Sequence, residues 1–160
     1  MRENKQVFLT ILACLALLLF ILLMTSAAPY ASPPCLWHVP ARLDVYEMAE
    51  VVTGAPSRIL RAIARAESNE SDEALGDDGV SVGRFQINER YHRERARLYG
   101  EYNPCIALEA ARIAGGLYID NLRELGTEDR AISAHRWGLS GERAHGLDQA
   151  YVSRVKANAR

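Results

Sequence analysis

A single glutamate at the end of an amphipathic stretch is the residue best suited to chemistry in this chain. Glu67 follows Ile59 and Ile63 at intervals of four, so the three residues share one face of a helix. Acids are rarely buried on an apolar face unless they are paired or have a task. A carboxyl that retains its proton in such surroundings can act as a general acid. The alternative interpretation is a Glu that turns to solvent or pairs with Arg61 or Arg65.

A second polar motif follows Glu67 after a loop. Residues 69–81 are rich in acids and glycine, and this composition predicts a loop with a small hairpin around Asp78-Gly79. The stretch Gly-Arg-Phe-Gln-Ile-Asn then occupies residues 83–88. The two motifs are therefore expected to lie on either side of one polar loop.

Five or six short helices are expected to position these motifs. Caps, glycines and prolines place them at residues 41–52, at 57–68, from Asn88 to Tyr99, from Asn103-Pro104 to Leu125, from Thr127 to Trp137 and from Ser140 onward. The residues predicted to face inward at the two ends of the domain are Leu43, Tyr46, Met48, Val51, Leu147, Tyr151 and Val155. Gly115-Gly116 is costly inside a helix, and close packing against a neighbouring helix is a reason to accept that cost. The fold class is a compact, mainly α bundle.

The first 28 residues have the order of an export signal. A short polar start with two basic residues precedes the apolar residues 7–24, and small residues follow. This segment is either a cleaved signal peptide or an uncleaved N-terminal membrane anchor, and both predict an exported domain. Residues 29–40 contain four of the six prolines and are expected to form an extended linker. The domain is then 41–160, periplasmic or secreted, and attached to the inner membrane by residues 7–24 if these are retained.

Composition and cysteine content restrict the class of protein. The chain has 160 residues, 49% of them hydrophobic, and a formal net charge of -1, which suits one domain plus a short extra segment and does not favour nucleic-acid binding. Cys14 lies in the apolar segment, so Cys35 and Cys105 remain as a disulfide candidate or as two thiols. No histidine stands at ligand spacing from them, so neither a metal site nor a cofactor is expected.

The motifs together resemble the lysozyme-like superfamily, and most of all the soluble type of lytic transglycosylase from bacterial cell walls. Those proteins carry a Glu-Ser-Gly motif, a Gly-Leu-Met-Gln-Ile motif, an Ala-Tyr-Asn-Ala-Gly-like turn and a closing Tyr-Val-x-Arg-Val helix. The corresponding stretches here are Glu67-Ser68-Asn69, Gly83 to Ile87, Ala134 to Gly138 and Tyr151 to Val155. The resemblance covers roughly residues 56–156.

The sequence departs from the family pattern at several positions. Asn69 stands where glycine is usual, although animal-type lysozymes also carry Asn there. His135, Arg136 and Trp137 replace the Tyr, Asn and Ala of the third motif, and Arg84 replaces an apolar residue. The tyrosine that His135 replaces is expected in the family to hold the catalytic carboxyl or the sugar.

The resemblance implies an α+β lysozyme-like fold with a sugar-binding groove. It also implies peptidoglycan lytic transglycosylase activity, with Glu67 as general acid and then general base. In animal lysozymes the second carboxylate lies five residues before the Gln of the shared motif, and that position is Ser81 here. This difference favours a mechanism with one carboxylate rather than a pair. The expected substrate-binding residues are Ser68, Gln86, Asn88, His135, Trp137 and Tyr151.

Two other functions fit the same residues. A hydrolytic muramidase of this fold would need a second acid, for example Asp78. A non-catalytic module for wall binding or assembly would explain the altered third motif. The expected partners are peptidoglycan glycan strands, with an envelope-spanning secretion system or a flagellum as the machinery served, and the membrane if the N-terminal segment is retained.

Overall fold

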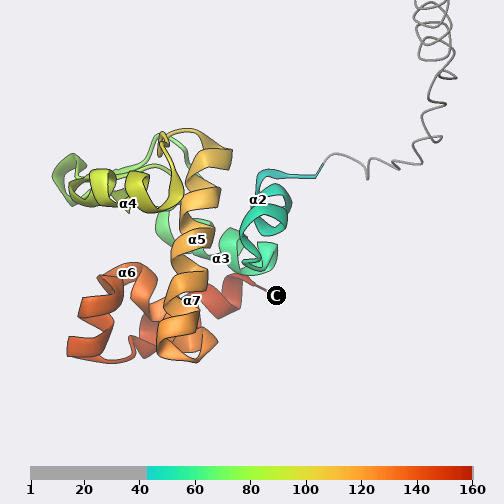
Figure 1. Cartoon of the computed structure of the whole chain (residues 1–160). Helices are drawn as coiled ribbons and strands as arrows, with labels where there is room; N and C mark the ends of the chain where they lie inside the picture. Colours follow the sequence, from blue (N-terminus) through green and yellow to red (C-terminus); the bar gives the residue numbers. More distant parts are fainter. Residues whose placement is uncertain (1–42, 160) are drawn as a thin grey trace, which may run out of the picture. The chain divides into compact units, whose positions relative to one another are not determined.

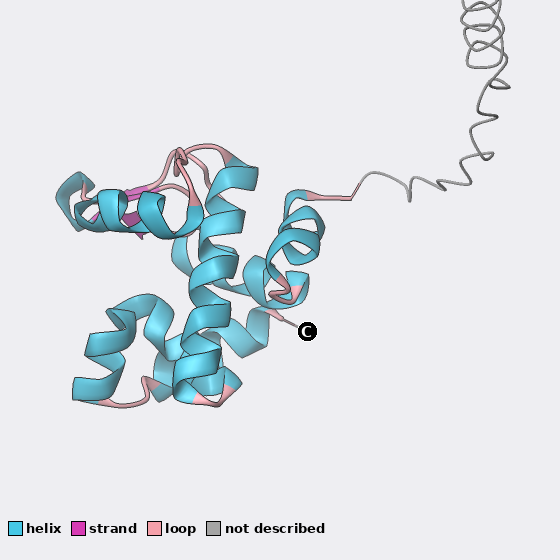
Figure 2. Ribbon diagram, in the orientation of Figure 1, coloured by secondary structure: helices cyan, strands magenta, loops and turns pink. Residues whose placement is uncertain are grey.

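The computed structural model describes residues 43–159. In this range the chain forms six α-helices and a three-stranded antiparallel sheet, so the prediction of a mainly helical domain is confirmed (Figures 1 and 2). The predictions for the export signal, the proline-rich linker and Cys35 lie outside the described residues. Within residues 43–159, no helix has both the length and the apolar character needed to span a membrane.

In the described residues, two helices precede three very short strands and four helices follow them. The helices are α2 (Val45–Thr53), α3 (Ser57–Ser68), α4 (His92–Tyr99), α5 (Ala107–Leu125), α6 (Glu128–His145) and α7 (Gln149–Asn158). The strands are β1 (Leu75–Gly76), β2 (Ser81–Val82) and β3 (Ile87–Asn88). Helix α5 contacts α2, α3, α4 and α6, and it runs through the middle of the domain in Figure 1. The buried apolar core is built mainly around α3, α5 and α7.

The first helix begins later than the sequence predicts. The Asp44 side chain accepts hydrogen bonds from the backbone N–H groups of Tyr46 and Glu47, which fixes the start of α2 at Val45. Tyr46 is buried, as predicted, but the inward placement of Val51 is wrong, since its side chain is 76% exposed. Leu43 precedes the helix and is also exposed.

The hairpin prediction is confirmed, and a third strand extends it. Strand β1 pairs antiparallel with β2, with Leu75 opposite Val82, and β2 pairs antiparallel with β3. The chain turns between β2 and β3 at Gly83, which has φ of 74°. A Cβ on Gly83 would lie 2.2 Å from the carbonyl oxygen of Pro104, so this turn requires glycine.

Helices α5 and α7 start later than predicted, whereas α6 starts after its predicted cap Thr127 and extends beyond its predicted end. Asn103 forms a turn instead of starting α5, because its side chain accepts from Cys105 N at 2.9 Å and its carbonyl from Ile106 N at 3.0 Å. Gly138 interrupts α6 with φ of 70° and ψ of 167°, and a second helical piece continues to His145. The last helix is therefore α7, capped by Asp148, and it does not start at Ser140.

Burial in the last helix follows from that later start. Tyr151 and Val155 lie within α7 and are buried, as predicted. Leu147 precedes α7, in the connection from α6, and its side chain is exposed, so its inward placement is wrong.

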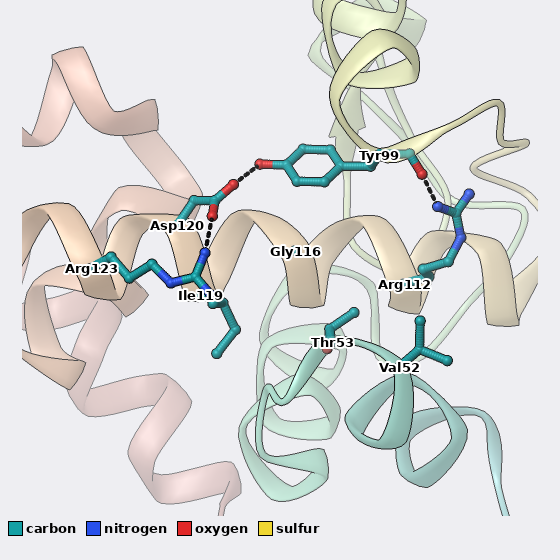
Figure 3. Close-up of a pocket in the computed structure, with 8 residues that line it drawn as sticks. All are labelled: Val52, Thr53, Tyr99, Arg112, Gly116, Ile119, Asp120 and Arg123. Carbon is teal, nitrogen blue, oxygen red and sulfur yellow. Dashed lines mark hydrogen bonds and ion pairs between the residues drawn. The ribbon is translucent and has the colours of Figure 1, made fainter.

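The Gly115-Gly116 pair lies where α5 approaches two neighbours closely. A Cβ on Gly115 would lie 2.5 Å from Thr53 Oγ1, and a Cβ on Gly116 would lie 2.8 Å from the Tyr99 ring. Figure 3 shows Thr53, Gly116 and Tyr99 around a pocket on this part of α5. The expectation that close packing explains the glycine pair is confirmed.

We expect Gly115→Ala to destabilise the domain, because the new Cβ must displace Thr53. The strain should cost about 1–3 kcal/mol, against about 1 kcal/mol gained from helix propensity. Urea unfolding of Gly115→Ala, Thr53→Ala and the double variant measures the balance. Thr53→Ala removes the Oγ1 and Cγ2 atoms that the new Cβ would meet at 2.5 and 3.1 Å, so it should lower the penalty of the Gly115 substitution. An unchanged penalty in the double variant would contradict the proposed clash.

Buried tyrosines make the stability of the fold sensitive to alkaline pH. Burial raises the pKa of Tyr46 and the pKa of Tyr118 to about 12, from the model-peptide value of 10.0. In the unfolded chain these phenols ionise near pH 10, whereas the folded protein retains their protons. Above that pH the unfolded state binds fewer protons than the folded state, so the stabilising contribution is full below pH 10 and is lost as pH rises toward 12.

We therefore expect the free energy of unfolding to fall above pH 10, by about 1.4 kcal/mol per pH unit for each such tyrosine. Urea unfolding across this pH range measures the slope. In the Tyr118→Phe variant the slope of the free energy of unfolding against pH should be smaller by the contribution of one tyrosine. An identical slope in that variant would show that Tyr118 does not contribute.

Candidate active site

Glu67 lies in the last turn of α3, and Tyr151 holds its carboxyl. The Tyr151 hydroxyl donates a hydrogen bond to Glu67 Oε1 at 2.5 Å. Tyr151 occupies the first turn of α7 and is 1% exposed, whereas Glu67 is partly exposed. Helices α3 and α7 pack against each other, which brings together two side chains that are 84 residues apart. The candidate acid is thus both accessible and fixed.

The surroundings keep the Tyr151 phenol protonated. Burial raises the pKa of Tyr151 well above its usual value, and the neighbouring Glu67 carboxyl raises it further. Arg154 and Arg136 act in the opposite direction but do not outweigh these effects. Tyr151 is therefore a permanent hydrogen-bond donor to Glu67 around neutral pH.

Ser68 and Asn69 shape the end of α3. The Ser68 hydroxyl donates to the Arg84 carbonyl oxygen at 2.9 Å and accepts from Ser71 N at 3.0 Å. Asn69 has φ of 56° and ψ of 39°, a left-handed conformation that glycine adopts most easily and Asn tolerates. This conformation gives a physical reason for Asn at a position where the resembling family has glycine.

Gln86 organises the hairpin from within the protein. Its Nε2 donates to the carbonyl oxygens of Gly83 at 3.0 Å and Ala74 at 3.2 Å. A Cβ at Gly76 would lie 2.2 Å from Gln86 Oε1, so the strand approaches this side chain closely. Phe85 and Ile87, on either side of Gln86, are buried in the core.

Asn88 and His135 also make contacts within the protein. Asn88 Oδ1 accepts from Arg90 N at 3.0 Å, so Asn88 caps a short 3₁₀ turn that leads into α4. His135 Nε2 lies 3.0 Å from the Phe85 carbonyl oxygen. A carbonyl can only accept, so this nitrogen carries the hydrogen, and His135 joins α6 to the Gln86 segment. Contacts of Asn88 and His135 with a sugar stay predictions.

Trp137 presents an aromatic surface to solvent. It is 44% exposed and ends the first piece of α6, just before Gly138. The Arg136 guanidinium lies 4.8 Å from the centre of its ring, and the His145 ring lies 5.7 Å away. An exposed aromatic face of this kind suits stacking against a sugar ring.

Arg84 is bound inside the domain. Its Nε and Nη2 lie 2.6 and 2.9 Å from the two oxygens of Asp72, and its Nη1 donates to Tyr46 Oη at 2.9 Å. The side chain is 12% exposed, and Asp72 raises the pKa of the guanidinium. A charged residue at this position of the motif is therefore accommodated by a bidentate partner from the preceding loop.

Three polar residues near Tyr151 were not singled out from the sequence. Glu142 is 0% exposed and accepts from Ser133 Oγ at 2.5 Å, and Ser133 Oγ accepts from Asp148 N at 2.9 Å. Glu142 lies among charged and small residues, so no periodicity signals its burial. The glycines at 138 and 141 were the one local indication that the helix is interrupted there.

The cysteine and metal predictions do not involve Glu67. Cys105 is exposed, and its predicted partner Cys35 is outside the described residues. Among residues 43–159, no group of three or more His, Cys, Asp or Glu side chains is placed to hold a metal ion.

Comparisons with known proteins add no relative of this chain. A scan against protein-family models gives no match, and a search of curated proteins gives no match either.

Proposed function

We propose that this chain is a peptidoglycan lytic transglycosylase. It cleaves the β-1,4 bond between N-acetylmuramic acid and N-acetylglucosamine and forms 1,6-anhydro-N-acetylmuramic acid. The observation that carries the proposal is the 2.5 Å hydrogen bond from Tyr151 to Glu67, at a partly exposed helix end tied by Ser68 to the Gln86 segment. A single carboxyl held in this way suits a reaction in which the same group donates and then accepts a proton.

The reaction needs no cofactor and consumes no water. Protonated Glu67 gives its proton to the glycosidic oxygen, the bond from that oxygen to C1 of muramic acid breaks, and N-acetylglucosamine leaves with a hydroxyl. The acetamido group of the substrate stabilises the positive charge at C1. The Glu67 carboxylate then takes the proton of the C6 hydroxyl as O6 bonds to C1, which restores the protonated acid. An aligned internal nucleophile has an effective molarity of about 10⁵ M or more, so it outcompetes water.

Tyr151 supports both halves of this cycle. Its hydroxyl donates to Glu67 Oε1 whether the other carboxyl oxygen carries a proton or not. The bond is strengthened when Glu67 becomes negative, because hydrogen bonds to ionised acceptors are the stronger kind. Tyr151 therefore orients the acid and stabilises the charge that appears when the leaving group is protonated.

In this proposal, the glycan strand binds in a lysozyme-like groove that runs past the end of α3. Trp137 offers an aromatic face for one sugar, while Ser68, Gln86, Asn88 and His135 shape the wall through their contacts with the backbone. Residues 7–24 would deliver the domain to the periplasm, where local opening of the wall would serve a secretion system or a flagellum.

Digestion of purified peptidoglycan tests the proposal. Mass spectrometry of the released muropeptides should find muramic acid ends that are lighter by one water than hydrolysed ends. Ends of hydrolysed mass would instead support a muramidase. If the protein binds peptidoglycan but releases no muropeptides from it, a wall-binding module would be supported.

A muramidase is the second candidate, and one contact favours it. Ser81 stands where animal lysozymes carry their second carboxylate, and its hydroxyl donates to Asp77 Oδ2 at 2.5 Å. The acid next to this position is therefore Asp77, whereas the sequence pointed to Asp78. An Asp77→Asn variant that lost most activity would favour the pair of carboxylates.

A further inference from the structure

A buried carboxylate outside the proposed reaction lies in the second piece of α6. Glu142 is fully buried, although most acidic side chains of such domains face solvent. Removing a carboxylate from water is unfavourable unless it is paired and hydrogen-bonded. The contacts of Glu142 therefore indicate which parts of the structure depend on the buried carboxylate.

Both partners of Glu142 come from the first piece of α6. Arg130 Nε lies 3.0 Å from Glu142 Oε1, and the Ser133 hydroxyl donates to Glu142 Oε2 at 2.5 Å. Gly138 separates these partners from Glu142 along the chain, with a backbone conformation that is not helical. The carboxylate thus joins the two pieces of α6 across the interruption.

The carboxylate also fixes the direction of the next hydrogen bond. A serine hydroxyl can donate and accept, whereas an ionised carboxylate only accepts. Ser133 must therefore point its hydrogen at Glu142, and its lone pairs face the backbone N–H of Asp148, which donates at 2.9 Å. Ser133 is fully buried, so no solvent competes for this arrangement.

Asp148 carries the connection into α7. Its Oδ1 accepts from Tyr151 N at 2.9 Å as the N-cap of the helix, and its Oδ2 pairs with Arg136 at 2.9 Å. The Tyr151 hydroxyl reaches Glu67 Oε1 from the same turn. A continuous series of hydrogen bonds and one helical turn therefore links Glu142 to the candidate acid.

We propose that Glu142 is a positioning residue for Glu67, acting through Ser133, Asp148 and Tyr151. The expected fall in rate rests on the proposed transglycosylase activity. The expected change in the positions of Asp148 and Tyr151 does not depend on that activity. If Glu142 only joined the two pieces of α6, its loss would lower stability without changing the rate of the folded enzyme. If it positions Tyr151, its loss lowers the rate as well.

The Glu142→Gln variant separates these outcomes. Arg130 and Ser133 donate to different oxygens of Glu142, and glutamine replaces one of these oxygens with an NH₂ group that donates, so one of the two partners loses its acceptor. We expect kcat to fall about 10-fold with KM changed less than about twofold, because the acid is misplaced while substrate binding is retained. Hydrogen exchange at the Asp148 amide should become faster. Ser133→Ala should give the same losses, and the two substitutions together should cost little more than either alone.

The matched control is Ile113→Val, a conservative change in the α5 core. Ile113 is fully buried and belongs to no part of the site, so its substitution lowers stability without altering kcat. Wild-type kcat in both Glu142→Gln and Ser133→Ala would overturn the proposal, even if exchange at the Asp148 amide became faster. If the wild-type protein releases no muropeptides, the proposed function fails. Faster exchange at the Asp148 amide and a shifted Tyr151 hydroxyl proton resonance in Glu142→Gln would then still show that Glu142 positions Tyr151, and unchanged values of both would show that it does not.

Discussion

Replacement of Glu67 by glutamine is expected to abolish the release of muropeptides from peptidoglycan. General acid–base catalysis by one positioned side chain contributes about 10²–10⁴-fold, and in the proposed mechanism the same carboxyl acts in both steps. We therefore expect kcat to fall by about 10³-fold or more. The fold should be retained, because the Oε1 of glutamine still accepts the hydrogen bond that Tyr151 donates. Muropeptide release, circular dichroism and thermal unfolding measure the two effects separately.

Glu73→Gln is the matched control for this prediction. Glu73 is an exposed glutamate in the loop that follows α3, so the same chemical change there removes one charge from the same region. Its release rate should stay near that of the wild type. Substantial activity in Glu67→Gln would place the acid elsewhere and contradict the mechanism. Equal losses in both variants would instead indicate an effect of net charge.

Local sequence patterns located the helix that carries the acid. The spacing of Ile59, Ile63 and Glu67 predicted one face, and the two isoleucines are fully buried. Gly54 ends the preceding helix with φ of 79°, as its residue type predicts. Such signals are local, since a cap or a periodic stripe depends on residues within a few turns. They fail where the same residue has another local use, as at Asn103, whose side chain stabilises a turn with Cys105 N instead of capping α5.

The contacts around the acid were less accessible to sequence reasoning. The family resemblance marked Tyr151, but only the packing of α3 against α7 places its hydroxyl on Glu67, 84 residues away. Glu142 was missed because its burial depends on its contacts with the first piece of α6 across the interruption at Gly138. The ion pair of Arg84 was also missed, because in the sequence its partner Asp72 does not differ from the other acids of the polar loop. Sequence patterns therefore identified the candidate acid, while the contacts that hold its carboxyl join elements that are distant in the sequence.

Removal of the Tyr151 hydroxyl should have the second largest effect on activity. In Tyr151→Phe the ring still fills its buried site, but Glu67 Oε1 loses its donor. The carboxyl is then free to adopt other rotamers, and a small misplacement of a catalytic group costs about 10²-fold in rate. We expect kcat to fall about 100-fold with KM nearly unchanged, because the tyrosine acts on the acid and not on the bound strand. Steady-state release of muropeptides measures both constants.

Tyr118→Phe provides the control for the loss of a buried phenol. Tyr118 is as deeply buried as Tyr151 but lies in α5, and its substitution should leave kcat unchanged. Since both variants lose one buried hydroxyl, a difference in kcat reports the contact with Glu67 and not the removal of a polar group from the core. A fall in the apparent affinity for peptidoglycan with kcat unchanged would assign Tyr151 to sugar binding. Wild-type values of both constants would show that Glu67 is held without it. Only a selective loss of kcat agrees with a tyrosine that orients the acid.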